Sequence, residues 1–217
     1  IVLWETAHGK IEAGFRLPIA VVWGFAGFVS CIFASVIGAS LAAENDGHLP
    51  VAWTKPCSRL AYASAKMAVD LGAIAIVYAL ACAAVFIYLW AIGLGRELYA
   101  PSDAVGQFVR FLIAPAAFYG LLQALTATLS RGAGAVLGFT WVGLIALEAL
   151  ATLPLPAAYH AIFNFINNAN PLVYISFDVD SHGSIIMVGL AAATTALALI
   201  AATGGAAAIY RWQRMEA

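Results

Sequence analysis

The sequence predicts an all-α fold, a polytopic bundle of membrane-spanning helices, and three observations support this prediction. Of the 217 residues, 64% are hydrophobic and only 10% are charged, which is far from the balance of a water-soluble domain. The charges lie between long apolar runs, each close to the roughly 20 residues that a helix needs to cross a bilayer. The formal net charge of -1 leaves no basic excess to attract nucleic acid. We therefore expect an integral membrane protein that binds no nucleic acid.

Division of the chain at its charges predicts a single transmembrane domain over residues 1–217 with five spans. The third and fourth apolar runs are separated only by Arg131, which predicts a tight helical hairpin with its turn at one membrane face. Asp70 is expected near the interface, at the start of the second span. The spans are predicted at about 17–43, 68–95, 110–130, 132–153 and 183–210, with longer connecting segments at 44–67 and 154–182.

The Lys and Arg residues of the connecting segments predict the orientation. The face that holds segment 44–67 carries six of them, Lys66 included, and the other face carries four, Arg110 included. Segment 154–182 contains neither Lys nor Arg, which is typical of an external segment. We therefore expect segment 44–67 and the C-terminus in the cytoplasm.

Five spans with a cytoplasmic C-terminus place residue 1 outside the cell. The opening residues "IVLWETAHGK" show no signal-peptide pattern that would carry them there. We therefore expect a native protein with six spans, of which the first is missing from this chain. A five-span protein with an external N-terminus is the alternative that stays open.

Segment 44–67 is longer than a turn requires, and prolines divide it. The stretch from Leu49 to Lys55 has room for one short helix, which Pro56 would end. Ser58 is a suitable N-cap, and "SRLAYASAKMAVD" contains no helix breaker, so a helix is expected to run unbroken from Ser58 into the second span. The expected geometry is a short surface helix, a sharp break and a long membrane helix.

The residues "ENDGHLPVAWTKPCSRLAYASAK" of this segment resemble the loop after the second span in ABC transporter permeases of the type 2 exporter class. In that family the part before the proline is the coupling helix, which docks in a groove of a cytoplasmic ATPase subunit. Large apolar side chains would anchor in that groove, and basic ones would pair with acids or lipid phosphates. The expected contact residues are Glu44, Gly47, Leu49, Trp53, Thr54, Lys55, Pro56, Ser58 and Arg59.

The resemblance implies the permease subunit of an ATP-driven exporter in a bacterial inner membrane, which moves substrate by alternating access. Two such subunits, identical or homologous, would associate in the lipid bilayer, and each would receive one P-loop ATPase. The chain itself has no G-x-x-x-x-G-K-[ST] loop and no hydrolase motif. We therefore expect no catalytic residue and no cofactor here, with ATP and Mg on the partner. The alternative is an integral scaffold or anchor subunit of a larger membrane complex. In that case the basic residues of segment 44–67 reflect only the preference of Lys and Arg for the cytoplasmic side of a membrane.

Glu148 is the one acid well inside an apolar run, which makes it a candidate functional residue. Counting from Arg131 places it about 25 Å along its helix, near the external interface, where a structural hydrogen bond is an equal alternative. Type 2 exporters carry short re-entrant helices after this span that cap the exit path, and "PAAYHAIFNFINN" resembles one. Glu148, Tyr159 and His160 are therefore the candidates for a substrate path or external gate.

Two further patterns concern metal binding and packing. Asp178, Asp180 and His182 have the side chains of metal ligands, but three candidates in one loop lack a fourth, so we expect no metal. Gly134 and Gly138 form a G-x-x-x-G pair, and small residues recur in the last span. Such patterns let helices approach closely.

Overall fold

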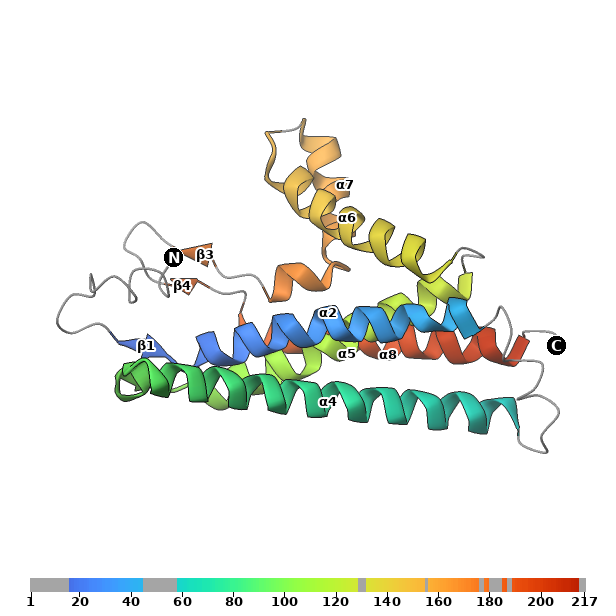
Figure 1. Ribbon diagram of the computed structural model, residues 1–217. Helices are drawn as coiled ribbons and strands as arrows, with labels where there is room; N and C mark the ends of the chain where they lie inside the picture. The colour runs from blue at the N-terminus through green and yellow to red at the C-terminus, as the bar shows by residue number, and fades with distance from the viewer. Residues whose placement is uncertain are drawn as a thin grey trace.

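The computed structural model is a bundle of long helices (Figure 1). Within its described residues, five helices are long and apolar enough to cross a membrane, so the chain is an integral membrane protein. These helices are α2 (Ala20–Glu44), α4 (Arg59–Ala91), α5 (Ala104–Thr128), α6 (Ala133–Thr152) and α8 (Leu190–Arg214). The structure describes residues 16–44, 58–128, 132–154, 156–175, 178–179, 185–186 and 189–214.

Successive long helices run in opposite directions. In Figure 1 the last residues of α2, α5 and α8 lie at the same end of the bundle as the first residues of α4 and α6. Both ends of segment 44–58 therefore lie at this end, together with the end of α8. The shorter elements are β1 (Leu17–Pro18), η1 (Leu94–Glu97), β2 (Leu98–Tyr99), α7 (Ala157–Asn167), η2 (Pro171–Tyr174), β3 (Asp178–Val179) and β4 (Ile185–Ile186). Strand β1 is parallel to β2, and β3 is antiparallel to β4.

Several of the predicted span boundaries differ from the observed ones. The first span begins at Ala20 instead of residue 17, because Leu17–Pro18 forms a strand. The second span ends at Ala91 instead of residue 95, and Gly93 follows with a positive φ of 83° that ends the helix. The third begins at Ala104 instead of residue 110, because Arg110 is a buried residue of α5 and not part of a loop. The fifth begins at Leu190 instead of residue 183, because Ile185–Ile186 forms a strand.

Helix α5 lies at the centre of the bundle and contacts both α2 and α8. A Cβ atom built on Gly204 of α8 would lie 2.5 Å from the backbone of Gly120, and one on Gly38 of α2 would lie 2.8 Å from the Cβ of Leu122. These contacts are too close for any residue but glycine. The backbones of three helices therefore meet along α5.

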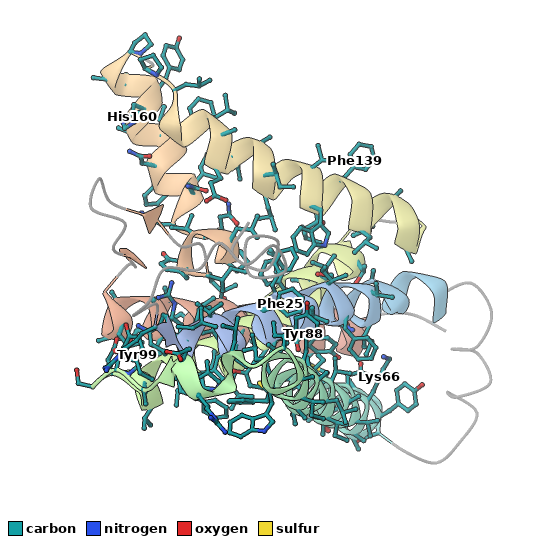
Figure 2. All side chains as sticks on the ribbon, turned by 60° about the vertical axis from the view of Figure 1, so that its left-hand side comes forward. Phe25, Lys66, Tyr88, Tyr99, Phe139 and His160 are labelled. Carbon is teal, nitrogen blue, oxygen red and sulfur yellow. The ribbon has the colours of Figure 1, made fainter. Side chains whose placement is uncertain are left out.

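The outer faces of α4 and α6 carry large exposed apolar side chains. Trp90 and Ile87 of α4 are 68% and 70% exposed, and Phe139 of α6 is 74% exposed. Figure 2 shows Phe139 pointing away from the bundle. Surfaces of this kind are unfavourable in water and favourable in lipid, which agrees with the membrane-spanning role of both helices.

The glycines of α6 do not take part in such close contacts. Cβ atoms built on Gly134 and Gly138 would meet no other atom of the described chain within 4 Å. The predicted G-x-x-x-G pair is therefore not a helix-packing contact among the described residues. The small residues of the last span, which include Gly204, do form one.

Matched Gly→Ala substitutions should have opposite effects at these two places. Gly204→Ala is expected to lower the free energy of unfolding by about 1–3 kcal/mol, because its methyl group would overlap the backbone of α5. Gly138→Ala should raise it by about 0.5–1 kcal/mol, because alanine favours the helix and the site is open. Thermal unfolding in detergent measures both changes. Equal effects would show that α5 and α8 can separate freely at Gly120.

Candidate functional site

The segment that resembles a coupling region is described at its two ends. Residues 45–57, with Gly47, Leu49, Trp53, Thr54, Lys55 and Pro56 among them, lie outside the described residues. Glu44 is the last residue of α2. Ser58 is the N-cap of α4, and its hydroxyl oxygen accepts a hydrogen bond from the backbone N–H of Ala61 at 3.1 Å. The predicted N-cap and the unbroken helix that follows it from Arg59 are therefore confirmed.

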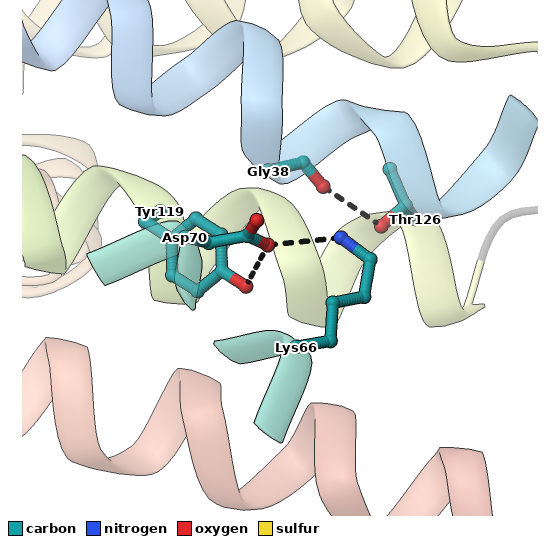
Figure 3. A network of polar contacts seen from close by, with 5 residues as sticks. All are labelled: Gly38, Lys66, Asp70, Tyr119 and Thr126. Carbon is teal, nitrogen blue, oxygen red and sulfur yellow. Dashed lines mark hydrogen bonds and ion pairs between the residues drawn. The ribbon is translucent and has the colours of Figure 1, made fainter. Parts of the chain in front are cut away.

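Polar side chains connect α4 to α5 near this end of the bundle (Figure 3). The Nζ of Lys66 donates to Oδ2 of Asp70 at 2.9 Å, and the hydroxyl of Tyr119 donates to the same oxygen at 2.7 Å. The side chains of Lys66 and Asp70 are each 15% exposed, and Tyr119 is 1% exposed. We call these three residues the α4–α5 joint. Because one carboxylate oxygen holds both donors, the joint sets the position of α4 against α5.

Asp70 lies where the predicted helix from Ser58 places it. It is 11 residues after Arg59, about 16 Å along α4. The spacing of four residues between Lys66 and Asp70 was a usable signal for their ion pair. The contribution of Tyr119 was not predictable, because it comes from another helix.

Helix α2 is attached to the same part of α5. The hydroxyl of Thr126 donates to the carbonyl oxygen of Leu122 at 2.9 Å. The same hydroxyl oxygen lies 3.4 Å from the carbonyl oxygen of Gly38 on α2 (Figure 3). Gly38 also packs directly against Leu122. The helices that precede and follow segment 45–57 are therefore both anchored to α5.

An open pocket of about 510 Å³ lies between α2 and α6. One stripe of each helix forms its walls, with residues spaced four apart on α2 and three or four apart on α6. The indole of Trp141 stacks on Phe118 of α5, with ring centroids 5.1 Å apart, which ties this wall to the core. The lining residues are Phe28, Ile32, Val36, Leu137, Trp141, Ile145, Glu148 and Leu172.

Glu148 is half-buried and, among the described residues, is the only charged one that lines the pocket. Among the described residues, no hydrogen bond or ion pair joins its carboxylate, so the structural hydrogen bond considered for it is not found there. The other two candidates for a gate lie elsewhere, on α7. Tyr159 is exposed, and Nδ1 of His160 lies 3.0 Å from the amide nitrogen of Asn164 (Figure 2). Among the described residues, Tyr159 and His160 do not line the pocket with Glu148.

Two buried polar side chains hold η2 against the bundle. The amide nitrogen of Asn170 donates to the carbonyl oxygen of Leu144 at 2.9 Å, and its Oδ1 accepts from the backbone N–H of Leu172 at 3.0 Å. The Nε of Arg110 donates to the carbonyl oxygen of Tyr174. Sequence analysis had counted Arg110 as a loop charge, but it is fully buried in α5. These bonds place Leu172 in the wall of the pocket.

Among the described residues, no group of three or more His, Cys, Asp or Glu side chains is placed to hold a metal ion. The strand β3 contains Asp178, whereas Asp180 and His182 lie outside the described residues.

Comparison of this chain with protein-family models, with curated proteins and with solved structures finds no match. The functional assignment therefore depends on the residues and the geometry described above.

Removal of one hydroxyl should weaken the α4–α5 joint. Tyr119→Phe is expected to lower the free energy of unfolding by about 1–3 kcal/mol, because it removes a buried hydrogen bond to a carboxylate. Tyr88→Phe on α4 is the matched control, because that side chain is exposed and its hydroxyl bonds to no described residue. Denaturant unfolding followed by tryptophan fluorescence gives both values. A Tyr119→Phe variant as stable as Tyr88→Phe would show that the bond contributes nothing.

The side chain of Asn170 should contribute more to the free energy of unfolding than that of Asn168. Asn170→Ala is expected to lower the free energy of unfolding by about 1–3 kcal/mol, because it leaves the N–H of Leu172 and the carbonyl of Leu144 without this partner. Asn168→Ala removes an exposed side chain and should change stability by less than about 0.5 kcal/mol. Hydrogen exchange around η2 reports the local effect. Similar exchange rates in the two variants would rule out Asn170 as the anchor.

Proposed function

We propose that this chain is the membrane-spanning permease subunit of an ATP-driven ABC exporter of the type 2 class. Two features support the proposal. The residues from Glu44 to Lys66 resemble the coupling region of that class. The structural observation that carries the proposal is that both helices flanking this region, α2 and α4, are anchored to the central helix α5.

Helix α4 has the properties of a lever for such coupling. It is 33 residues long, about 50 Å, which exceeds the roughly 20 residues needed to cross a bilayer. Its first turns therefore stand at the headgroup level on the proposed cytoplasmic face, capped by Ser58. A rigid-body movement of the ATPase against segment 44–58 would pass along α4 to the α4–α5 joint without a break in the helix.

The central helix then transmits the movement. The joint attaches α4 to α5 at Tyr119. The next residue of α5, Gly120, contacts Gly204 of α8. A shift of α5 therefore displaces α8, and repeated shifts driven by ATP would reorient the spans around a transport path by alternating access.

In the proposed assembly, partner subunits would supply the ATP-binding site and would cover the exposed apolar faces. The sequence contains no P-loop, so ATP and Mg would bind to a separate ATPase subunit that docks on the coupling segment. A second permease, identical or homologous, and the lipid bilayer would cover the exposed apolar faces of α4 and α6. The C-terminus and segment 44–67 would face the cytoplasm of a bacterial cell. A scaffold subunit would use the same faces, but it would need no ATPase.

Co-purification and a coupling assay test the proposal. The full-length protein isolated from its membrane should bring a soluble P-loop ATPase with it. The double variant Trp53→Ala, Arg59→Ala should lower ATPase association by about tenfold or uncouple hydrolysis from substrate movement, because it removes an apolar anchor and a charge. Trp90→Ala, Arg96→Ala is the control, since these exposed residues lie at the opposite end of the bundle.

The two hypotheses make opposite predictions in this experiment. If no P-loop ATPase is retained, or if the Trp53 and Arg59 variant behaves like the Trp90 and Arg96 control, the coupling function is wrong. A scaffold subunit would instead retain other integral membrane proteins and tolerate both double variants.

A further inference from the structure

We infer that the pocket between α2 and α6 binds a cationic amphiphile, with its positive head at Glu148 and its apolar tail along the pocket. The inference deepens the proposed function by naming a substrate class, and it rests on that function only in calling the ligand a substrate. Binding itself is a property of this chain, so it can be tested without an ATPase.

The shape of the pocket fits an elongated apolar group. Its α6 wall extends from Leu137 to Glu148, which are 11 residues apart and therefore about 16 Å apart along the helix. Its α2 wall extends from Phe28 to Val36, about 12 Å. The volume of about 510 Å³ lies within the range of about 300–1,000 Å³ found for small-molecule sites. Of the eight described residues that line the pocket, seven have apolar side chains, so transfer of a hydrocarbon tail from water to this surface is favourable in free energy.

The charge of Glu148 decides the sign of the head group. A half-buried carboxylate beside apolar walls has lost part of its hydration, and no described residue compensates it. A ligand with a positive head supplies the missing partner, whereas a negative head would be repelled. A neutral ligand with the same tail would gain only the apolar contacts. The pocket therefore favours cations over neutral and anionic amphiphiles of equal length.

The position of Glu148 fits the way an amphiphile lies in a leaflet. It is four residues before the end of α6 at Thr152, about 6 Å along the helix. It therefore lies near the end of α6, whereas Leu137 lies about one turn from the beginning of that helix. A head at Glu148 would stay near the headgroup level, and the tail would point toward the middle of the bilayer. Because the pocket is open, the ligand can enter sideways from the lipid.

Trp141 provides a direct reporter for occupancy. Its indole lines the pocket between Leu137 and Ile145. A bromine atom on the tail of a bound ligand would quench its fluorescence, and a Trp141→Phe variant identifies how much of the quenching comes from this site among the six tryptophans.

The test uses the full chain in nanodiscs of phosphatidylcholine, titrated with a bromoalkyl trimethylammonium and with a neutral bromoalkyl alcohol of equal chain length. We expect saturable quenching that Trp141→Phe removes, and an affinity about tenfold higher for the cation than for the alcohol. Glu148→Gln should abolish this preference and leave the alcohol unaffected. Glu97→Gln is the matched control, because Glu97 is exposed and does not line the pocket.

A second variant tests the apolar part of the site. Ile32→Phe should weaken binding of the cation and the alcohol alike, because the larger side chain occupies part of the pocket without adding a tryptophan. Equal affinity for cation and alcohol in the wild type, an unchanged preference in Glu148→Gln, or quenching that does not saturate would each overturn the inference. Loss of ATPase association with binding intact would instead overturn the proposed function and leave the site in place.

Discussion

The close approach of α5 to α2 and α8 is the constraint on which the rest of the structure depends. Gly38, Gly120 and Gly204 remove the side chains that would hold these backbones apart. In a bilayer the lipid tails are as apolar as the helix surfaces, so helices associate through tight packing and polar contacts more than through the hydrophobic effect. The position of α5 also fixes three other features, because its side chains take part in each of them: the α4–α5 joint, the contact that holds η2, and one wall of the pocket.

Several polar side chains inside the bundle are paired with one another, whereas the carboxylate of Glu148 has no partner among the described residues. Lys66 and Asp70 pair with each other, with Tyr119 as a third partner, and Asn170 bonds to three groups. A polar group away from water is costly without such partners, so these residues stabilise the arrangement that satisfies them. The carboxylate of Glu148 has no partner among the described residues and faces a pocket, which is why it is the better candidate for binding.

Much of the fold was predictable, and the errors have local causes. The long apolar runs predicted five spans, and Ser58 was recognised as an N-cap because its side chain precedes an uninterrupted helix. The start of α5 was placed too late, because division at charges assumes that an arginine lies outside the membrane, whereas Arg110 is buried. The start of α8 was placed too early, because hydropathy alone does not separate the apolar strand Ile185–Ile186 from a helix.

The sequence by itself determined the membrane class and the helix content, because hydropathy and caps are properties of neighbouring residues. The coupling role of residues 44–67 stays a prediction from the sequence. Only the tertiary structure decided which polar residues act together. It joined Tyr119 to Asp70 across 49 positions of the chain, and it placed Glu148, but neither Tyr159 nor His160, among the described residues that line the pocket. It also brought Gly204, and not Gly138, into close contact with another described helix. The physical reason is that such contacts depend on how helices are rotated and placed against one another, and no pattern within a single helix records that.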